Sequence, residues 1–232
     1  MPVNRVRMSA SAITIMTLCL AALTITACTG GSATRQRDSE GRVLPTLAEQ
    51  DPTGTLYAKS ISDARRGECD ERTLDVLTCF SYRGHGYEGA QTALGQCLIS
   101  TGNNAEGIDW VRRAAEAGWP DAQKLLAQMY LDGDVTTRDT VEAAKWAKLY
   151  SRNPALLSLG VQPDRDVTLA FRDKITPPQN AAAESLVAEW SPRYWTPATQ
   201  IDQAVKNSCE IEGRRPRPRR HEIPSTTIPG AY

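Results

Sequence analysis

Two stretches of this chain share one pattern: Ala90-Gln91-Thr92-Ala93-Leu94-Gly95 returns, thirty-two residues later, as Ala122-Gln123-Lys124-Leu125-Leu126-Ala127. A glycine-aromatic pair, Gly86-Tyr87 or Gly118-Trp119, precedes each copy, and a segment centred on a tryptophan follows it. Apolar residues recur at the i, i+3, i+4 spacing of one helix face. A fixed period of this length, with two short helical segments in each unit, indicates an α-helical repeat.

The tryptophan-centred segments, predicted to be the second helices of the two repeats, cover residues 104–117 around Trp110 and 139–150 around Trp146. Asn103-x-x-Glu106 and Asp139-x-x-Glu142 have the spacing of a capping box at a helix start. Gly118 suits the left-handed conformation that ends a helix. Pro120 suits the first turn of the next helix, where its missing N–H costs nothing.

The alanine-rich spacing, the Leu94-Gly95 pair and the segment Trp110-x-x-Arg113-Ala114-Ala115-Glu116-x-Gly118 together resemble the Sel1-like repeat family, relatives of the tetratricopeptide repeats. This resemblance implies an all-α fold, a short α/α solenoid of Sel1-like helical hairpins, and the role of a binding scaffold. No segment alternates strictly enough to predict a strand. The regular pattern covers only residues 86–152, and a pair of repeats is fewer than stability usually needs.

Flanking segments are therefore expected to complete the core. On the amino-terminal side this is a half-repeat, residues 57–85. On the carboxyl side, segments 164–174 and 178–190 are predicted to be a pair of capping helices that shield the last repeat. The predicted repeat domain is thus 56–195.

The amino terminus has the form of a secretory signal, because Arg5 and Arg7 precede an apolar run. The run is short for a membrane-spanning helix, which needs about 20 residues, and residues 1–27 are predicted to be a cleaved signal peptide. The tetrad Ile25-Thr26-Ala27-Cys28 resembles the bacterial lipobox, which implies a palmitate-type lipid on Cys28. The alternatives are an uncleaved membrane anchor and a cysteine present by coincidence.

Residues 28–55 are predicted to be a flexible tether, since they are rich in Gly, Ser, Thr and charge and contain Pro45 and Pro52. Thr29 follows the lipobox cysteine, where an aspartate is associated with inner-membrane retention in some bacteria. The predicted location is therefore the outer membrane, facing the periplasm, in a diderm host. Membrane association would come through the amino-terminal lipid.

Residues 196–232 are predicted to be a largely disordered tail, because their apolar content falls and prolines interrupt the basic run from Arg214 to His221. Only residues 201–205 keep enough apolar character for a helix that leads to Cys209. The basic run suits contact with anionic lipid headgroups or a phosphate-rich polymer. The alternative is a solvated tail that only aids solubility.

Apart from the leader and the lipidated position, the cysteines are Cys69, Cys79, Cys97 and Cys209. An even number in an exported chain favours disulfides, although four cysteines allow three connectivities. If the helices near 70–83 and 87–101 are antiparallel, Cys97 lies about 6 Å from Cys69 along the axis and about 9 Å from Cys79. A disulfide needs Cα atoms within about 7 Å, so Cys69–Cys97 is favoured and Cys79–Cys209 follows by elimination. Unpaired buried thiols are the alternative.

Composition and motifs exclude several function classes. The 27 basic and 27 acidic residues leave no positive field for nucleic acid. His85 and His221 form no HExxH pair, and the chain has neither a G-x-S-x-G elbow nor a glycine-rich phosphate loop. Cys79 near His85 lacks an orienting partner, and the carboxylates of 132–139 lack the calcium-loop pattern. The chain is predicted to be no enzyme, with no catalytic residue, cofactor or metal site.

The Sel1-like resemblance also implies where a partner would bind, because in this family the first helix of each repeat lines the concave surface. The candidate groove residues on those helices are Gln91, Gln96, Lys124 and Gln128. They are predicted to hold a helix or peptide of a protein partner, and the alternative is that they only face water. The predicted function is a lipid-anchored scaffold in an envelope assembly, export or signalling complex.

A second function class is a protein that binds or modifies cell-wall glycan. It would need a cleft carboxylate with a raised pKa, because general acids are tuned toward the working pH. The candidates are Glu116, Glu184 and Glu189. Each also stands where an ordinary surface charge of a helix would stand.

Overall fold

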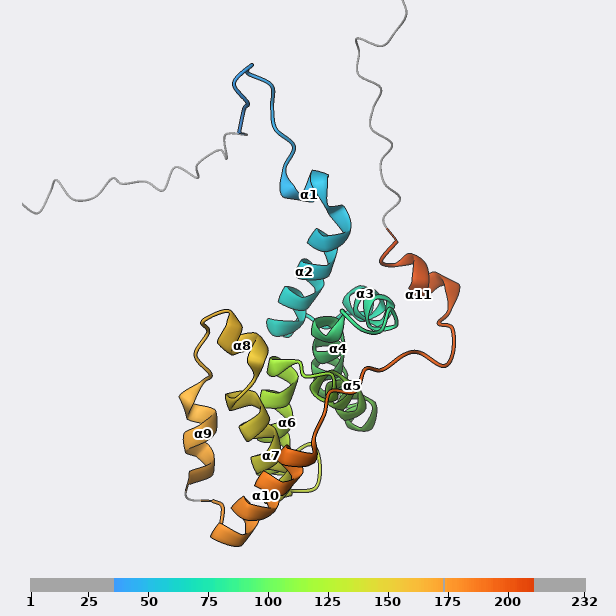
Figure 1. The fold of residues 1–232 in the computed structure, drawn as a ribbon. Helices are drawn as coiled ribbons and strands as arrows, with labels where there is room; N and C mark the ends of the chain where they lie inside the picture. The colour runs from blue at the N-terminus through green and yellow to red at the C-terminus, as the bar shows by residue number, and fades with distance from the viewer. Residues whose placement is uncertain (1–35, 173, 211–232) are drawn as a thin grey trace, which may run out of the picture. The chain divides into compact units, whose positions relative to one another are not determined.

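The computed structural model describes residues 36–172 and 174–210, and helices are the only extended regular elements in those ranges (Figure 1). The chain divides into two compact units, 1–46 and 47–232. In the first unit, the described residues form a turn with an isolated antiparallel bridge between Arg37 and Val43. In the second, every regular element of the described part is a helix, which confirms the all-α prediction. No helix in the described ranges is long and apolar enough to span a bilayer.

The helices described in the second unit are α1 (Leu47–Gln50), α2 (Pro52–Arg65), α3 (Glu71–Ser81), α4 (Glu88–Ser100), α5 (Asn104–Glu116), α6 (Pro120–Asp132), α7 (Thr140–Ser151), α8 (Pro154–Ser158), α9 (Arg165–Arg172), α10 (Pro177–Glu189) and α11 (Gln203–Asn207). Consecutive helices pack in three pairs, α2 with α3, α4 with α5 and α6 with α7, which we call the first, second and third hairpins. After the last hairpin, α9 and α10 pack against α7, while α11 packs against α3 of the first.

The connection between the second and third hairpins follows the predicted turn chemistry. Gly118 has a φ of +92°, and the N–H of Trp119 donates to the carbonyl of Ala114 at 3.0 Å, which closes the end of α5. Pro120 is the first residue of α6, as predicted. The predicted capping box at the start of α5 is wrong, because the Asn103 side chain caps no backbone N–H and donates instead to Glu106 Oε2 at 2.7 Å.

Two glycines let α4 and α5 pack closely. A Cβ atom at Gly95 would lie 2.6 Å from the carbonyl oxygen of Gly107 and 2.6 Å from Val111 Cγ2. A Cβ atom at Gly107 would lie 2.6 Å from Ile99 Cγ1. Real Cβ atoms do not approach this closely, so the two backbones meet at a distance that only glycine permits.

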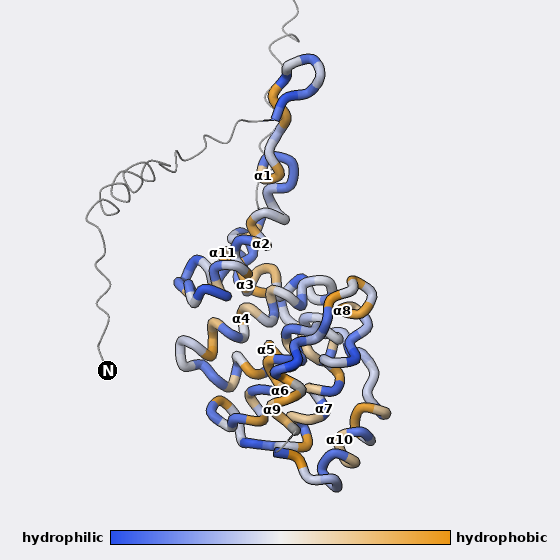
Figure 2. Tube along the Cα trace, turned by 90° about the vertical axis from the view of Figure 1, so that its left-hand side faces the viewer, coloured by the Kyte–Doolittle hydropathy of each residue, from blue (hydrophilic) through white to orange (hydrophobic). Residues whose placement is uncertain are grey.

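The buried side chains form two apolar clusters, one built mainly from α3 and α4 and the other mainly from α5, α6 and α7. Trp110 belongs to the first and Trp146 to the second, and each is only 2% exposed. Hydrophobic and hydrophilic residues alternate along the helices (Figure 2), as expected where one face of each helix is buried.

The amino-terminal boundary differs from the prediction. The predicted tether, 28–55, contains α1 and the first turn of α2, and the expected half-repeat is a complete hairpin. Pro52 begins α2 because a first helical position needs no N–H donor, and Asp51 Oδ1 caps the helix by accepting from the Gly54 N–H at 2.8 Å. The proline that suggested a linker therefore starts a helix.

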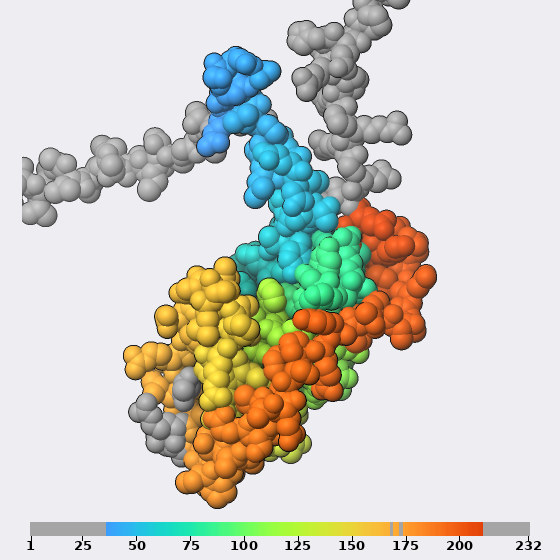
Figure 3. All heavy atoms as spheres, viewed as in Figure 1, coloured from blue at the N-terminus to red at the C-terminus, as the bar shows by residue number. Residues whose placement is uncertain are grey.

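The carboxyl boundary also differs. The predicted capping helices exist as α9 and α10, but residues 191–210, which we call the strap, continue across the helices and end in α11 (Figure 3). Within the predicted tail, 196–232, the helix expected near 201–205 corresponds to α11, and the described residues 196–210 pack on the repeat domain. Residues 1–35 and 211–232, which include the predicted signal peptide, Cys28 and the basic run, lie outside the described residues.

Candidate functional site

A groove with a volume of about 660 Å³ is lined by the first helix of each hairpin, α2, α4 and α6. Its apolar lining comes from Tyr57, Ala58, Ile61, Gly89, Ala93, Trp119 and Leu125. Its polar lining comes from Arg65, Thr92, Gln96, Asp121, Lys124 and Gln128. Three hairpins that are separate in sequence therefore share one surface.

Two aromatic residues converge on α4 at the floor of this groove. A Cβ atom at Gly89 would lie 2.7 Å from the Tyr57 hydroxyl and 3.3 Å from Trp119 Cζ2. Because glycine has no side chain, the Tyr57 and Trp119 rings can occupy the space beside the backbone of residue 89. Burial raises the pKa of Tyr57, so the phenol stays neutral in this apolar setting.

Two ion pairs lie at the edge of the groove. Arg65 at the end of α2 donates to Asp121 of α6 at 2.7 Å, which joins the first and third hairpins. Lys124 donates to Asp164, just before α9, at 2.6 Å. This hydrogen bond raises the pKa of Lys124 and lowers that of Asp164. Both pairs are partly exposed, so they orient side chains at the edge more than they stabilise the fold.

The structure brings three of the four predicted groove residues together: Gln96, Lys124 and Gln128 all line the groove. The prediction for Gln91 is wrong, because that side chain is only 2% exposed. Its amide donates to the carbonyl oxygens of Ser81 and Gly84 at 3.3 and 3.4 Å, which satisfies groups at the end of the preceding hairpin. Gln91 is thus part of the packing between hairpins.

The sequence analysis missed Tyr57, Trp119 and the Arg65–Asp121 pair. Trp119 had a signal, since it belongs to the glycine-aromatic pair before the second copy of the motif. Tyr57 and Arg65 lie in a helix outside the recognised repeats, and nothing local shows that they would face Trp119 and Asp121.

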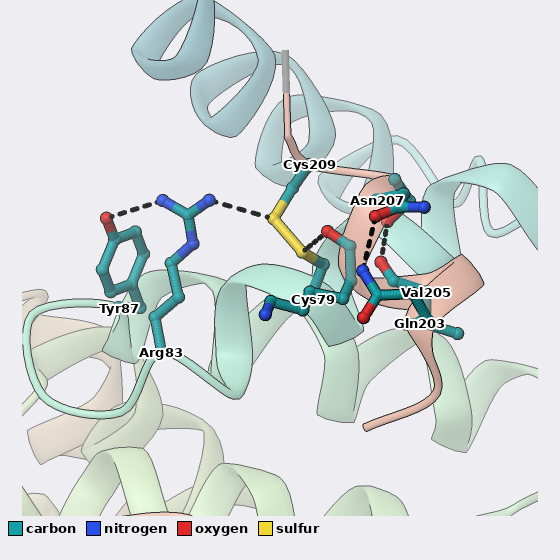
Figure 4. The surroundings of a disulfide bond; sticks show 9 residues. Cys79, Arg83, Tyr87, Gln203, Val205, Asn207 and Cys209 are labelled. Atoms are coloured by element: carbon teal, nitrogen blue, oxygen red, sulfur yellow. Dashed lines mark hydrogen bonds between the residues drawn. A yellow bond between two sulfur atoms is a disulfide. The ribbon is translucent and has the colours of Figure 1, made fainter. Parts of the chain in front are cut away.

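The structure contains the predicted cysteine pairs. Cys69 is bonded to Cys97, with Cα atoms 5.3 Å apart, and Cys79 is bonded to Cys209, with Cα atoms 5.9 Å apart. Figure 4 shows the second disulfide between α3 and α11, with Arg83 beside its sulfur atoms. A nucleophilic role for Cys79 beside His85 does not fit, because the Cys79 sulfur is already bonded.

The carboxylates of the glycan hypothesis lie outside the groove. Glu184 binds Arg152 and Lys148 at 2.9 and 2.8 Å, and these cations lower its pKa to about 2, the opposite of what a general acid needs. Glu116 accepts from Arg193 at 2.9 Å, and Glu189 is exposed at the end of α10. The described residues also contain no cluster of three or more His, Cys, Asp or Glu that could hold a metal ion.

Comparisons with known proteins give no independent assignment: no family model, curated protein or solved structure matches the chain.

Proposed function

We propose that this chain is a Sel1-like scaffold, a short α/α solenoid of three hairpins that binds a segment of a protein partner and catalyses no reaction. The observation that supports this most is the shared groove, because α2, α4 and α6 each contribute side chains to it. A site assembled from every hairpin fits a surface that holds one elongated ligand. This is how stacked repeats create extended binding surfaces.

The groove lining suggests the chemistry of the bound segment. The rings of Tyr57 and Trp119 offer an apolar floor for a large side chain, as aromatic residues do at protein interfaces. Gln96 and Gln128 each carry an amide that both donates and accepts hydrogen bonds, which suits the N–H and C=O groups of a peptide backbone. We therefore propose a peptide segment with at least one bulky apolar side chain.

In the same proposal the mature chain begins at Cys28, carries lipid there and faces the periplasm from the outer membrane. This part rests on the lipobox-like sequence and on the even cysteine count of an exported chain. Replacing Cys28 by Ala should abolish labelling with a palmitate analogue and release the protein from membranes. Unchanged membrane association of Cys28→Ala would show that the anchor lies elsewhere.

The groove is tested by photo-crosslinking of the full lipoprotein in cells. A photoreactive residue replaces Gln128, which is exposed in the groove, or Ser185, which is exposed on α10 outside it. We expect one protein adduct from position 128, none from position 185, and loss of the adduct when Gln96→Arg is added. Equal adducts at both positions would contradict binding in the groove. Adducts made only of glycan fragments would favour the alternative function, a protein that binds or modifies cell-wall glycan.

A further inference from the structure

The strap, residues 191–210, connects the two ends of the helical stack. It leaves α10, which packs on α7 of the third hairpin, and it ends at α11, which packs on α3 of the first. Between these ends it runs over the surface of the intervening helices (Figure 3). A single terminal segment therefore joins the last hairpin to the first.

Contacts with α5 and with the end of α3 hold the first part of the strap. The backbone N–H of Arg193 donates to the carbonyl of Glu116 at 2.8 Å. The ring of Trp195 meets Tyr82 and Trp110 edge-on, with centroids 5.6 and 5.1 Å away.

Arg113 strengthens the same contact. Its guanidinium carbon lies 4.4 Å from the Trp110 ring centroid and 4.7 Å from that of Trp195. One cation thus faces a ring on α5 and a ring on the strap, which is a favourable cation–π arrangement.

The far end of the strap is held covalently. Cys79 of α3 is bonded to Cys209, 130 residues away in sequence, and Cys209 is fully buried. The helix that carries this end, α11, has only five residues. A helix this short has little stability of its own, so its position depends on the disulfide.

The other disulfide has a different role. Cys69 and Cys97 are 28 residues apart and join the connection between α2 and α3 to α4, so both partners belong to the first two hairpins. Breaking that bond frees no terminal segment, because both cysteines lie among helices that pack on each other. Exposing Cys79–Cys209 requires only that a terminal segment move, which is a local opening of lower free energy.

We propose that Cys79–Cys209 is a thiol-exchange site that locks the strap, and that a dithiol reductant opens it while the three hairpins stay folded. The surroundings of the two sulfurs are unequal. Cys79 lines a cavity of about 280 Å³ between α3 and the strap. Arg83 donates to Cys209 Sγ at 3.3 Å (Figure 4).

This asymmetry assigns a role to each sulfur. A nearby guanidinium favours the thiolate form of a cysteine, and a better-stabilised thiolate leaves faster in disulfide exchange. Cys79 is therefore the sulfur that is attacked, and Cys209 is the leaving group.

The reaction proceeds in two exchanges. A thiolate of the dithiol attacks Cys79 Sγ, the Cys79–Cys209 bond breaks, and its electron pair leaves on Cys209. The second thiolate of the reductant then attacks the reductant sulfur that is bonded to Cys79. This breaks the mixed disulfide and releases Cys79 as a thiolate. The protein gains two electrons and two protons, and the dithiol becomes a disulfide.

The first test uses glutathione, a monothiol, on the oxidised full-length protein, followed by alkylation and peptide mapping. At early times we expect glutathione on Cys79 and the alkylating reagent on Cys209, with Cys69–Cys97 intact. Replacing Arg83 by Met should slow this exchange several-fold. Glutathione found first on Cys209, or on the Cys69–Cys97 pair, would overturn the assignment.

The second test measures hydrogen exchange in Cys79→Ser/Cys209→Ser, with Cys69→Ser/Cys97→Ser as the matched control. We expect amides of α11 to exchange roughly tenfold faster or more in the first variant, while α4 to α7 stay protected. Faster exchange throughout α4 to α7 would show that the bond stabilises the whole fold. No change in α11 would show that the bond does not hold the strap in place. Either result contradicts the proposal. Neither test involves a ligand of the groove, so neither depends on the proposed function.

Discussion

Asn153 and Gln123 are hydrogen-bonded to each other inside the helical stack, Nδ2 of Asn153 donating to Oε1 of Gln123 at 2.8 Å. Both side chains are almost completely buried, at 3% and 1% exposure. Gln123 in turn donates to the carbonyl of Ala115 at 3.3 Å, and Asn153 also donates to that of Gly118 at 2.8 Å. The end of the third hairpin is thus bonded to the turn that begins it.

Replacing Asn153 by Ala should lower the free energy of unfolding by about 2–3 kcal/mol, because it leaves buried oxygens of Gly118 and Gln123 without a donor. The loss also includes the cap of α8, where Asn153 Oδ1 accepts from the Ala155 N–H. Urea unfolding followed by circular dichroism measures this. The exposed Ser185→Ala serves as the control, and equal midpoints for the two variants would contradict the structural role.

Gln91 occupies in the first copy of the motif the position that Gln123 occupies in the second. Its burial could not be predicted from the sequence. The resemblance to the Sel1-like family implied the helix face that holds Gln96, Lys124 and Gln128, and these residues do line the groove. The sequence pattern could not show that the Gln91 side chain on α4 donates a hydrogen bond to a carbonyl at the end of α3. That need arises only when one hairpin packs on the next.

The hairpins themselves were predictable because their signals are local. The predicted helices 104–117 and 139–150 agree closely with α5 and α7, since glycine turns and buried tryptophans mark them. The strap carries a weaker signal, the apolar residues 201–205 before Cys209. Its order comes from Trp195 and Cys209, whose partners lie on other helices and far away in sequence.

Replacing Gly95 by Ala should destabilise the protein by about 2–3 kcal/mol, because the added methyl group would overlap the Gly107 carbonyl and Val111. Gly102→Ala is the matched control. Gly102 has a φ of +93° with no atom within 4 Å of a Cβ, so its cost of about 1–2 kcal/mol is conformational only. A smaller loss for Gly95→Ala than for Gly102→Ala, measured by urea unfolding, would refute close packing of α4 on α5.

Acid should weaken the contact between α10 and α7. The pKa of Glu184 is about 2 in the folded protein, below its ordinary value of 4.5, because Arg152 and Lys148 bind the carboxylate. Its stabilisation is therefore complete above pH 4.5 and is lost as the pH falls toward 2. Since the side chain is 40% exposed, we expect at most about 1 kcal/mol.

Comparing the wild type with Glu184→Gln tests this pH dependence. The difference between their free energies of unfolding should be largest at neutral pH and should shrink steadily as the pH falls from 4.5 through 2. Glu189→Gln, an exposed change on the same helix, is the control. A difference that stays constant between neutral pH and pH 2 would mean that the ion pair does not contribute through its charge.

Trp195 and Tyr194 are adjacent aromatic residues of the strap with unequal surroundings, and they give a matched pair of substitutions. Trp195→Ala removes contacts with Tyr82, Trp110 and Arg113, and we expect it to cost about 2 kcal/mol. Tyr194 is 54% exposed and meets only His85 among the described ring contacts, so its replacement should change stability by about 0.5 kcal/mol or less. Urea unfolding of both variants decides the matter. Equal losses would mean that the strap is not held through Trp195. Of the two rings, only that of Trp195 contacts Tyr82 and Trp110.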